Sequence, residues 1–261
     1  MKNATFFLLL LLAACTSGPD NPPDKAPQER LMIATAANVQ FAMQELAAAF
    51  TAQSGIPVET TVSSSGKLTA QIIQGAPYDL LLSANLKYPD TLIARDQAIP
   101  PNRTYARGAL VLWTTRDLAV ERGLELLDDL PGESIAVANP RNAPYGTQSI
   151  QVLERTNRLQ ALRDQLIFGE SISQTNQYIV SGAAAIGFTA KSVVRSPEMS
   201  EKGRWTDVPD SLYQPIAQGV VITRYGQENH PVAARAFLEF LFSDDAQAIF
   251  RSYGYQLPAE D

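Results

Sequence analysis

The sequence predicts an α/β protein with largely parallel sheets, because apolar runs of strand length alternate with amphipathic segments of helix length. A second indication is that several expected strands end in turns of small or hydroxyl residues that lead into helices. The expected strands are Leu31–Ala36, Val58–Ser63, Tyr78–Ala84, Ala109–Thr115, Ser134–Asn139, Gln165–Gly169, Ala184–Thr189 and Gly219–Thr223.

Helices are expected between these strands, and the clearest spans Val39–Thr51. Its apolar residues fall at spacings i, i+4, i+7 and i+8, which build one buried stripe; they are Ala42, Leu46, Ala49 and Phe50. The same periodicity predicts two late helices at Pro231–Phe242 and Asp244–Tyr253. The adjacent pairs Asp128-Asp129 and Asp244-Asp245 fit a helix end and a helix start.

The N-terminal segment has the pattern of an export signal. An apolar stretch at Phe6–Ala14 follows Met1-Lys2, and it is too short for a membrane-spanning helix. Leu12-Ala13-Ala14-Cys15 matches the lipobox of bacterial lipoproteins, so we expect a signal peptide at 1–14 and a lipidated Cys15. A proline-rich polar segment at 15–30 is expected to be a tether. The predicted location is therefore the cell envelope, periplasmic or extracytoplasmic, with a lipid anchor.

Composition argues against several classes of function. The net charge of −6 and the lack of a basic run argue against nucleic acid as a partner. His230 is the only histidine, at an expected helix start, and fits a capping or solvated role. With no histidine pair and no nucleophile beside a base, we predict neither an enzyme nor a metal site, and no catalytic residue.

The folded part is long enough for two domains, although no flexible linker divides it. Two domains would then be joined through strands, near Tyr105–Leu112 and Tyr213–Val221. This predicts a discontinuous first domain at 31–106 and 216–261, and an inserted second domain at 107–215.

Four strand-to-helix turns are candidate anion sites, because a helix N-terminus presents unpaired N–H groups and a partial positive charge. Each turn alone also fits an ordinary structural role; Asn38, for example, stands where an N-cap belongs. Two turns in each expected domain could surround a small anion from both sides. The turns are Ala36–Asn38, Ser63–Gly66, Asn142–Thr147 and Glu170–Ser173.

Several segments resemble the periplasmic molybdate-binding proteins of ABC transporters, and the similarity runs from about Leu31 to Gly254. The segment Gly75–Ala84, which reads G-A-P-x-D-[LV]-x-x-S-A, is the most specific of them. The others are Ala36–Met43, Ser63–Lys67 and Ala246–Tyr255.

The resemblance implies the type II periplasmic-binding-protein fold, with two α/β domains, two crossing strands and a ligand cleft between the domains. In that family backbone amides and hydroxyls hold the oxyanion, without a metal ion or a cofactor. Carried over by position, the ligand-binding residues are Ala37, Asn38, Ser65, Tyr145 and Ile172, the last through its N–H.

The sequence departs from one branch of the family, which has serine in place of Asn38 and a tyrosine donor in place of Ala190. A second branch, with asparagine in the first loop and tyrosine in the third, matches better. Tyr145 would then supply the hydroxyl that Ala190 lacks.

The function implied is that of a monomeric lipoprotein that captures molybdate or tungstate and delivers it to an ABC permease and ATPase. Alternatives are a binding protein of the same fold for sulfate, phosphate or an organic carboxylate, or a sensor lipoprotein without a transport role. Lys67 or Arg141 inside the cleft would favour a carboxylate ligand, and Glu170 facing the ligand would favour a protonated anion. We expect all three to point away from it.

Overall fold

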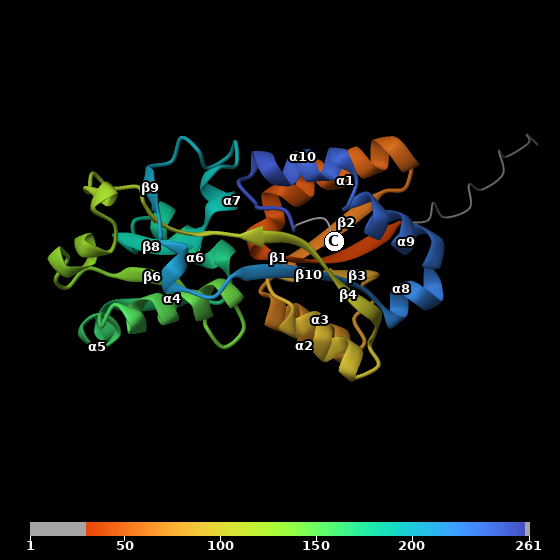
Figure 1. The fold of residues 1–261 in the computed structure, drawn as a ribbon, viewed down its shortest axis with the longest axis horizontal. Coiled ribbons are helices and arrows are strands. Elements are labelled where there is room, and N and C mark those ends of the chain that lie inside the picture. Colours follow the sequence, from red (N-terminus) through yellow and green to blue (C-terminus); the bar gives the residue numbers. More distant parts are fainter. Residues whose placement is uncertain (1–29, 259–261) are drawn as a thin grey trace, which may run out of the picture.

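The computed structural model describes residues 30–258, which form two five-stranded sheets side by side, each covered by helices (Figure 1). The expected signal peptide, Cys15 and nearly all of the tether lie outside the described residues. No helix in the described part of the chain is both long and apolar enough to cross a bilayer.

The first sheet has the strand order β2-β1-β3-β10-β4. β1 is parallel to β2 and β3, whereas β10 is antiparallel to β3 and β4. The strands are β1 (Leu31–Ala36), β2 (Val58–Ser63), β3 (Leu80–Leu82), β4 (Ala98–Gly108) and β10 (Ile216–Thr223). The helices of this half are α1 (Gln40–Ser54), α2 (Ser65–Ile73), α3 (Lys87–Ala94), α8 (Arg224–Asn229), α9 (Pro231–Phe240) and α10 (Asp244–Ser252).

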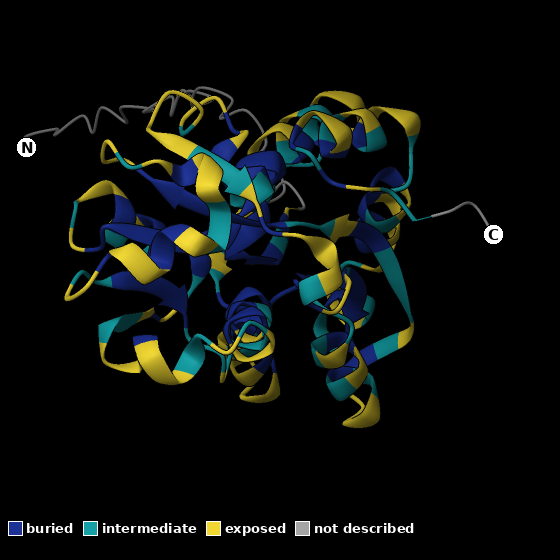
Figure 2. Ribbon diagram, turned by 60° about the vertical axis from the view of Figure 1, so that its left-hand side comes forward, coloured by how far each residue is buried: buried dark blue, intermediate teal, exposed yellow. Residues whose placement is uncertain are grey.

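Alternation along β1 shows how this sheet is buried on both faces. Leu31 and Ile33 belong to the core shared with α1, α9 and α10, while Ala34 packs with α2 and α3. Successive residues of a strand point to opposite faces, so a strand covered on both sides needs apolar residues throughout. Figure 2 shows the consequence, with buried strands inside and exposed residues on the outer faces of the helices.

The second sheet has the order β7-β6-β8-β5-β9. β6 is parallel to β7 and β8, and β5 is antiparallel to β8 and β9. The strands are β5 (Leu110–Thr114), β6 (Ile135–Ala138), β7 (Leu166–Gly169), β8 (Ile186–Ala190) and β9 (Arg204–Asp207). The α-helices are α4 (Pro144–Arg155), α5 (Leu159–Leu162), α6 (Ile172–Val180) and α7 (Lys191–Val194), and a long 3-10 segment, η2, spans Val120–Asp129.

The chain passes between the sheets twice, between β4 and β5 and between β9 and β10. β4 and β10 pair with each other and run together toward the second half of the molecule (Figure 1). The exact domain boundaries, 106/107 and 215/216, stay a prediction.

All eight expected strands are present, and the ranges of β1 and β2 match the prediction. Two strands were missed, β4 and β9, which lie at sheet edges and carry few apolar residues. Edge strands are exposed on one side and need no apolar alternation, which explains why periodicity did not reveal them. The expectation of largely parallel sheets was wrong, because β5 and β10 pair antiparallel with both of their neighbours.

The structure also corrects the role expected for His230. Its Nδ1 lies 2.8 Å from Oδ1 of Asp79, a fully buried carboxylate whose Oδ2 accepts the N–H of Met32 at 2.7 Å. His230 makes no side-chain cap. It instead partners a buried charge and joins the start of α9 to the first sheet.

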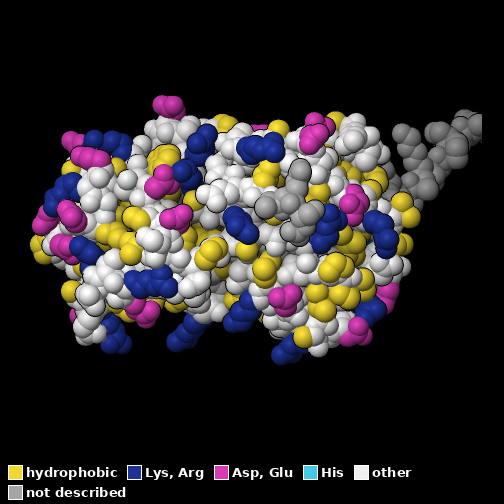
Figure 3. All heavy atoms as spheres, viewed as in Figure 1, with side chains coloured by type: hydrophobic (Ala, Val, Ile, Leu, Met, Phe, Trp, Pro, Cys, Tyr) yellow, Lys and Arg dark blue, Asp and Glu magenta, His cyan; other side chains and the backbone are white. Residues whose placement is uncertain are grey.

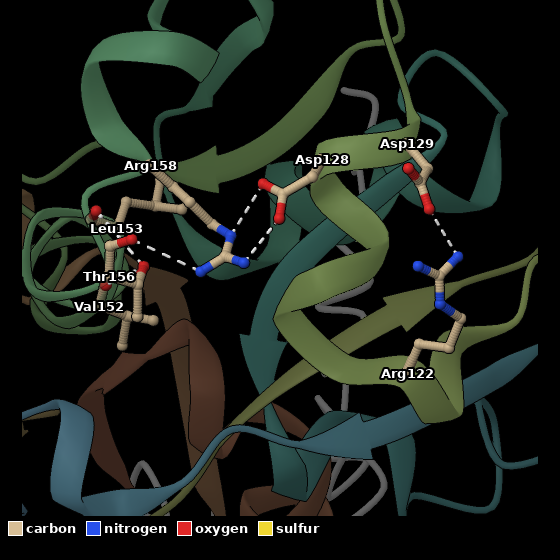
Figure 4. A network of polar contacts seen from close by, with 7 residues as sticks. All are labelled: Arg122, Asp128, Asp129, Val152, Leu153, Thr156 and Arg158. Atoms are coloured by element: carbon tan, nitrogen blue, oxygen red, sulfur yellow. Dashed lines mark hydrogen bonds and ion pairs between the residues drawn. The ribbon is translucent and has the colours of Figure 1, made fainter.

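Asp128 and Asp129 end the 3-10 segment η2, as predicted for a helix end. Figure 4 shows that both carboxylates form ion pairs, Asp128 with Arg158 and Asp129 with Arg122. The pair with Arg158 attaches η2 to the start of α5, whereas the pair with Arg122 lies within η2 itself.

Candidate functional site

The five residues proposed from the sequence occupy the first or second position of four helices. Ala37 and Asn38 open a 3-10 turn, η1 (Ala37–Val39), which continues into α1, and Ser65 opens α2. In the second half, Tyr145 is the second residue of α4 and Ile172 is the first of α6. Backbone N–H groups at these positions have no partner within their own helix, so they are free to bind an anion.

All five residues line one small cavity between the two halves, with about 190 Å³ of empty space. Each is at least 95% buried. The cavity has no charged residue in its lining, which is completed by Ala36, Ser64, Ala84, Ala143 and Pro144. The site can therefore supply neutral donors to a ligand but no counter-charge.

Two serines of the second turn offer hydroxyl donors. Ser65 Oγ accepts the N–H of Ala84 at 2.9 Å, which leaves its own proton free. Ser64 Oγ is buried and has no hydrogen-bond partner among the described residues. Since a buried hydroxyl without a partner is costly, Ser64 is a further candidate ligand. Sequence reasoning named the turn but did not single out Ser64, and three serines in a row carry no signal that separates them.

Asn38 does not cap a helix, contrary to its ordinary structural reading. Its side-chain Nδ2 donates to Gln218 Oε1 at 2.8 Å and to Tyr255 Oη at 3.1 Å, within the wall of the cavity. Its backbone oxygen accepts from Tyr255 and from Ser192. The side-chain N–H groups are thus already engaged, and the backbone N–H at the helix start is the donor that Asn38 can offer.

Tyr145 contributes a neutral phenol. Its Oη accepts from Gln218 Nε2 at 3.2 Å, and burial raises the pKa of Tyr145 well above its ordinary value of 10.0. The group therefore keeps its proton at neutral pH and can donate it. Ala190 is buried at the end of β8, directly before α7, and is not part of the cavity lining.

The rim of the cavity carries the one ion pair between the halves within residues 30–258, between Lys67 Nζ and Glu170 Oε2 at 2.7 Å. Both side chains are about half exposed, and neither lines the cavity. The hydrogen bond from Lys67 and its charge lower the pKa of the Glu170 carboxyl. Arg141 is exposed and also outside the lining, so none of these three charged side chains lines the cavity.

Uncharged hydrogen bonds also join the two halves around the cavity. They include Gly66 N–H to Asn142 O at 2.9 Å, Ser173 Oγ to Gln40 Oε1 at 2.6 Å and Ser192 Oγ to Asn38 O at 2.7 Å. A Cβ on Gly66 would lie only 2.8 Å from the Asn142 Cβ, so the close approach at this point requires glycine. The structure therefore shows the halves closed over the cavity.

Other features of the described chain are weaker candidates. A wider cavity lies beside the crossing strands, but its lining mixes Arg107 and Lys191 with Asp207 and Asp210, so charges of both signs face it. Residues 30–258 contain no cluster of three or more His, Cys, Asp or Glu side chains that could hold a metal. Figure 3 shows acidic and basic side chains interspersed over the face in view, without a continuous basic patch.

Two mixed sheets joined by two crossings, with helix starts from both halves around one cavity, define a solute-binding protein of the periplasmic type. A family profile described as bacterial extracellular solute-binding protein matches residues 31–256. The chain belongs to this family and, within it, to the ModA group of molybdate-binding proteins. It is accordingly an extracytoplasmic protein.

Known proteins support this assignment. The molybdate-binding protein ModA of Rhodobacter capsulatus is 37% identical over 227 residues, which cover 86% of this chain and 87% of that protein. The structure of the periplasmic molybdate-binding protein of Azotobacter vinelandii superimposes with a TM-score of 0.82 at 33% identity, covering 88% of this chain and all of that one. The sulfate-binding protein SubI of Mycobacterium tuberculosis shares the fold, with a TM-score of 0.71 at 16% identity over 89% of this chain and 88% of that one.

Proposed function

We propose that this protein captures a molybdate or tungstate dianion in the cavity between its halves and delivers it to an ABC permease and its ATPase. The observation that carries the proposal is the convergence of Ala37, Asn38, Ser65, Tyr145 and Ile172, all at helix starts, on one uncharged cavity. The names of the relatives from Rhodobacter and Azotobacter point to the same ligand.

The chemistry of the lining favours a fully ionised anion. Molybdate and tungstate carry no proton at neutral pH, so they need only donors, whereas phosphate keeps a proton part of the time and also needs an acceptor. No carboxylate lines the cavity, and the nearest one, on Glu170, is engaged by Lys67. A protonated anion would therefore meet no charged acceptor for its proton, only weaker neutral ones such as the hydroxyl oxygens of the two serines.

The number of donors is sufficient for tight binding. A hydrogen bond to a charged group contributes about 1.5–3 kcal/mol. About seven such bonds, less the costs of ordering and desolvation, reach roughly −12 kcal/mol, which corresponds to a nanomolar dissociation constant. Selectivity against sulfate would rest on size, because a smaller anion in a rigid cage leaves some donors without a partner.

The remaining parts of the proposal concern the setting of the site. Cys15 would carry the lipid anchor after cleavage of the signal peptide, and the protein would act as a monomer. It would need no cofactor and catalyse no reaction, since binding and release of an anion require neither.

The experiment that tests the proposal is isothermal titration of a fragment beginning at Leu31 with molybdate, tungstate, sulfate and phosphate in parallel. The expected result is tight one-to-one binding of the first two anions and no heat from the others. Binding of sulfate alone would assign the protein to another anion, and the absence of binding heat with all four anions would reject the oxyanion proposal.

A further inference from the structure

Gln218 lies in the middle of β10, is fully buried, and is not itself part of the cavity lining. Its side chain nevertheless contacts ligand candidates from both halves. Oε1 accepts from Asn38 Nδ2 and from Tyr105 Oη, each at 2.8 Å, and Nε2 donates to Tyr145 Oη at 3.2 Å. One amide on a crossing strand therefore connects the first-half loop to the second-half helix.

The direction of these hydrogen bonds determines what Tyr145 can offer. Because Gln218 Nε2 donates to it, the phenol oxygen acts as the acceptor in this pair, and its proton must point elsewhere. Within residues 30–258 the Tyr145 hydroxyl makes no second hydrogen bond. Tyr145 is one of the residues that line the cavity, so an oxygen of a bound anion is the acceptor that we consider for this proton.

The backbone around this contact is shaped to permit it. Gly108, at the end of β4, faces both groups, and a Cβ there would overlap Tyr145 Oη and lie 2.5 Å from Gln218 Nε2. The pairing of β10 with β4 also shifts register between Gln218 and Gly219. The absence of a side chain at Gly108 and the register shift in β10 thus occur where the Gln218 amide contacts the Tyr145 phenol.

We infer that Gln218 is a positioning residue that turns the Tyr145 hydroxyl proton toward the oxyanion. The same amide fixes the positions of Asn38 and Tyr145 relative to each other. The inference rests on the proposed function and deepens it, because it explains how a neutral tyrosine becomes a one-directional donor. A residue of this kind acts through hydrogen-bond polarity rather than through contact with the ligand.

The decisive variant is Gln218→Glu, which keeps the shape of the side chain but offers only acceptors when ionised. Tyr145 would then donate to the carboxylate and present a lone pair to the anion. We expect molybdate affinity at pH 8 to fall about 100-fold or more, through the lost donor and the buried negative charge. Burial raises the pKa of a carboxyl, so affinity should recover as pH falls toward 5.5 and the protonated group donates again.

Two further variants complete the test by titration calorimetry with molybdate, with thermal unfolding to check the fold. Gln218→Met removes both polar ends, and we expect a loss of about tenfold without a pH profile. Gln214→Glu makes the same charge change at an exposed position on the same approach to β10, and should bind like the wild type.

The outcomes separate the inference from the proposed function. A wild-type protein that binds none of the oxyanions rejects the function itself. If the wild type binds molybdate but Gln218→Met binds equally well, or Gln218→Glu loses the same affinity at every pH, Gln218 has no positioning role. If Gln218→Glu fails to fold at pH 8, the affinity of Gln218→Met alone decides the question.

Discussion

Opposite kinds of interaction hold together the wall and the rim of the cavity. The wall comprises the lining residues and the buried polar groups that bond to them, and the rim is the pair Lys67 and Glu170. In the wall, buried uncharged groups such as Asn38, Gln218 and Tyr145 bond to one another in fixed directions. At the rim, Lys67 and Glu170 form an ion pair in contact with water. Buried polar networks are costly to disturb, whereas exposed ion pairs contribute little, so we expect affinity to reside in the wall.

The largest effect should follow from Tyr145→Phe. The change removes a donor to the anion and leaves the Nε2 group of Gln218 unpaired in the wall, with an expected cost of about 2–3 kcal/mol, or roughly 100-fold in the dissociation constant. Titration calorimetry with molybdate measures it. Tyr178→Phe, a partly exposed position on α6 outside the cavity, is the matched control. Equal affinities for the two variants would remove Tyr145 from the site.

A somewhat smaller loss is expected for Ser65→Ala. It deletes one hydroxyl donor and the acceptor of the Ala84 N–H, which should weaken oxyanion binding by about 1–3 kcal/mol. The measurement is the same titration.

His230→Ala serves as the contrasting variant, because it leaves the buried Asp79 carboxylate without its side-chain partner but lies outside the cavity. We expect unchanged affinity and a free energy of unfolding lower by about 1–3 kcal/mol in urea denaturation. Equal losses of affinity in His230→Ala and Ser65→Ala would contradict the assignment of the site.

The pH dependence of binding should show how well the wall excludes water. Burial raises the pKa of Tyr145, so its donor is fully present below the ordinary value of 10.0 and is lost only as pH rises through the raised value. Molybdate affinity should therefore stay level from pH 7 to 10. A fall in affinity centred below pH 10, with the fold intact by circular dichroism, would show that the phenol is exposed to solvent.

The smallest effect is expected at the rim. Lys67→Met or Glu170→Gln should change molybdate affinity by less than about threefold, mainly through faster release, and the difference should vanish at high salt. Stopped-flow dissociation measures the rate, with Lys202→Met, an exposed position outside the site, as the control. A tenfold loss from either rim variant would overturn the division between wall and rim.

The sequence predicted the parts of the site that are local in the chain. The four turns were recognisable because each places small or hydroxyl residues between an apolar strand and a helix start, and Ala37, Asn38, Ser65, Tyr145 and Ile172 do line one cavity. Their roles toward a ligand rest on the resemblance and stay a prediction.

Contacts between distant parts of the chain were not predictable. Gln218 meets Asn38 across 180 residues, and His230 meets Asp79 across 151 residues, so no local pattern marks either pair. The space left by Gly108 is evident only once β4, β10 and α4 are placed together. Polar side chains in the core are specified by such long-range geometry, whereas periodicity reports only which faces are apolar.

The position of the candidate binding residues at helix starts has a consequence for how the proposed site can change. A main-chain N–H belongs to the backbone, so replacing the side chain of Ala37 or Ile172 leaves that donor in place as long as the helix begins there. Only the hydroxyl donors, on Ser64, Ser65 and Tyr145, can be gained or lost by a single substitution. Random substitutions would therefore leave most of the donors around the anion in place. A shift in preference from one oxyanion to another would arise at these three hydroxyls.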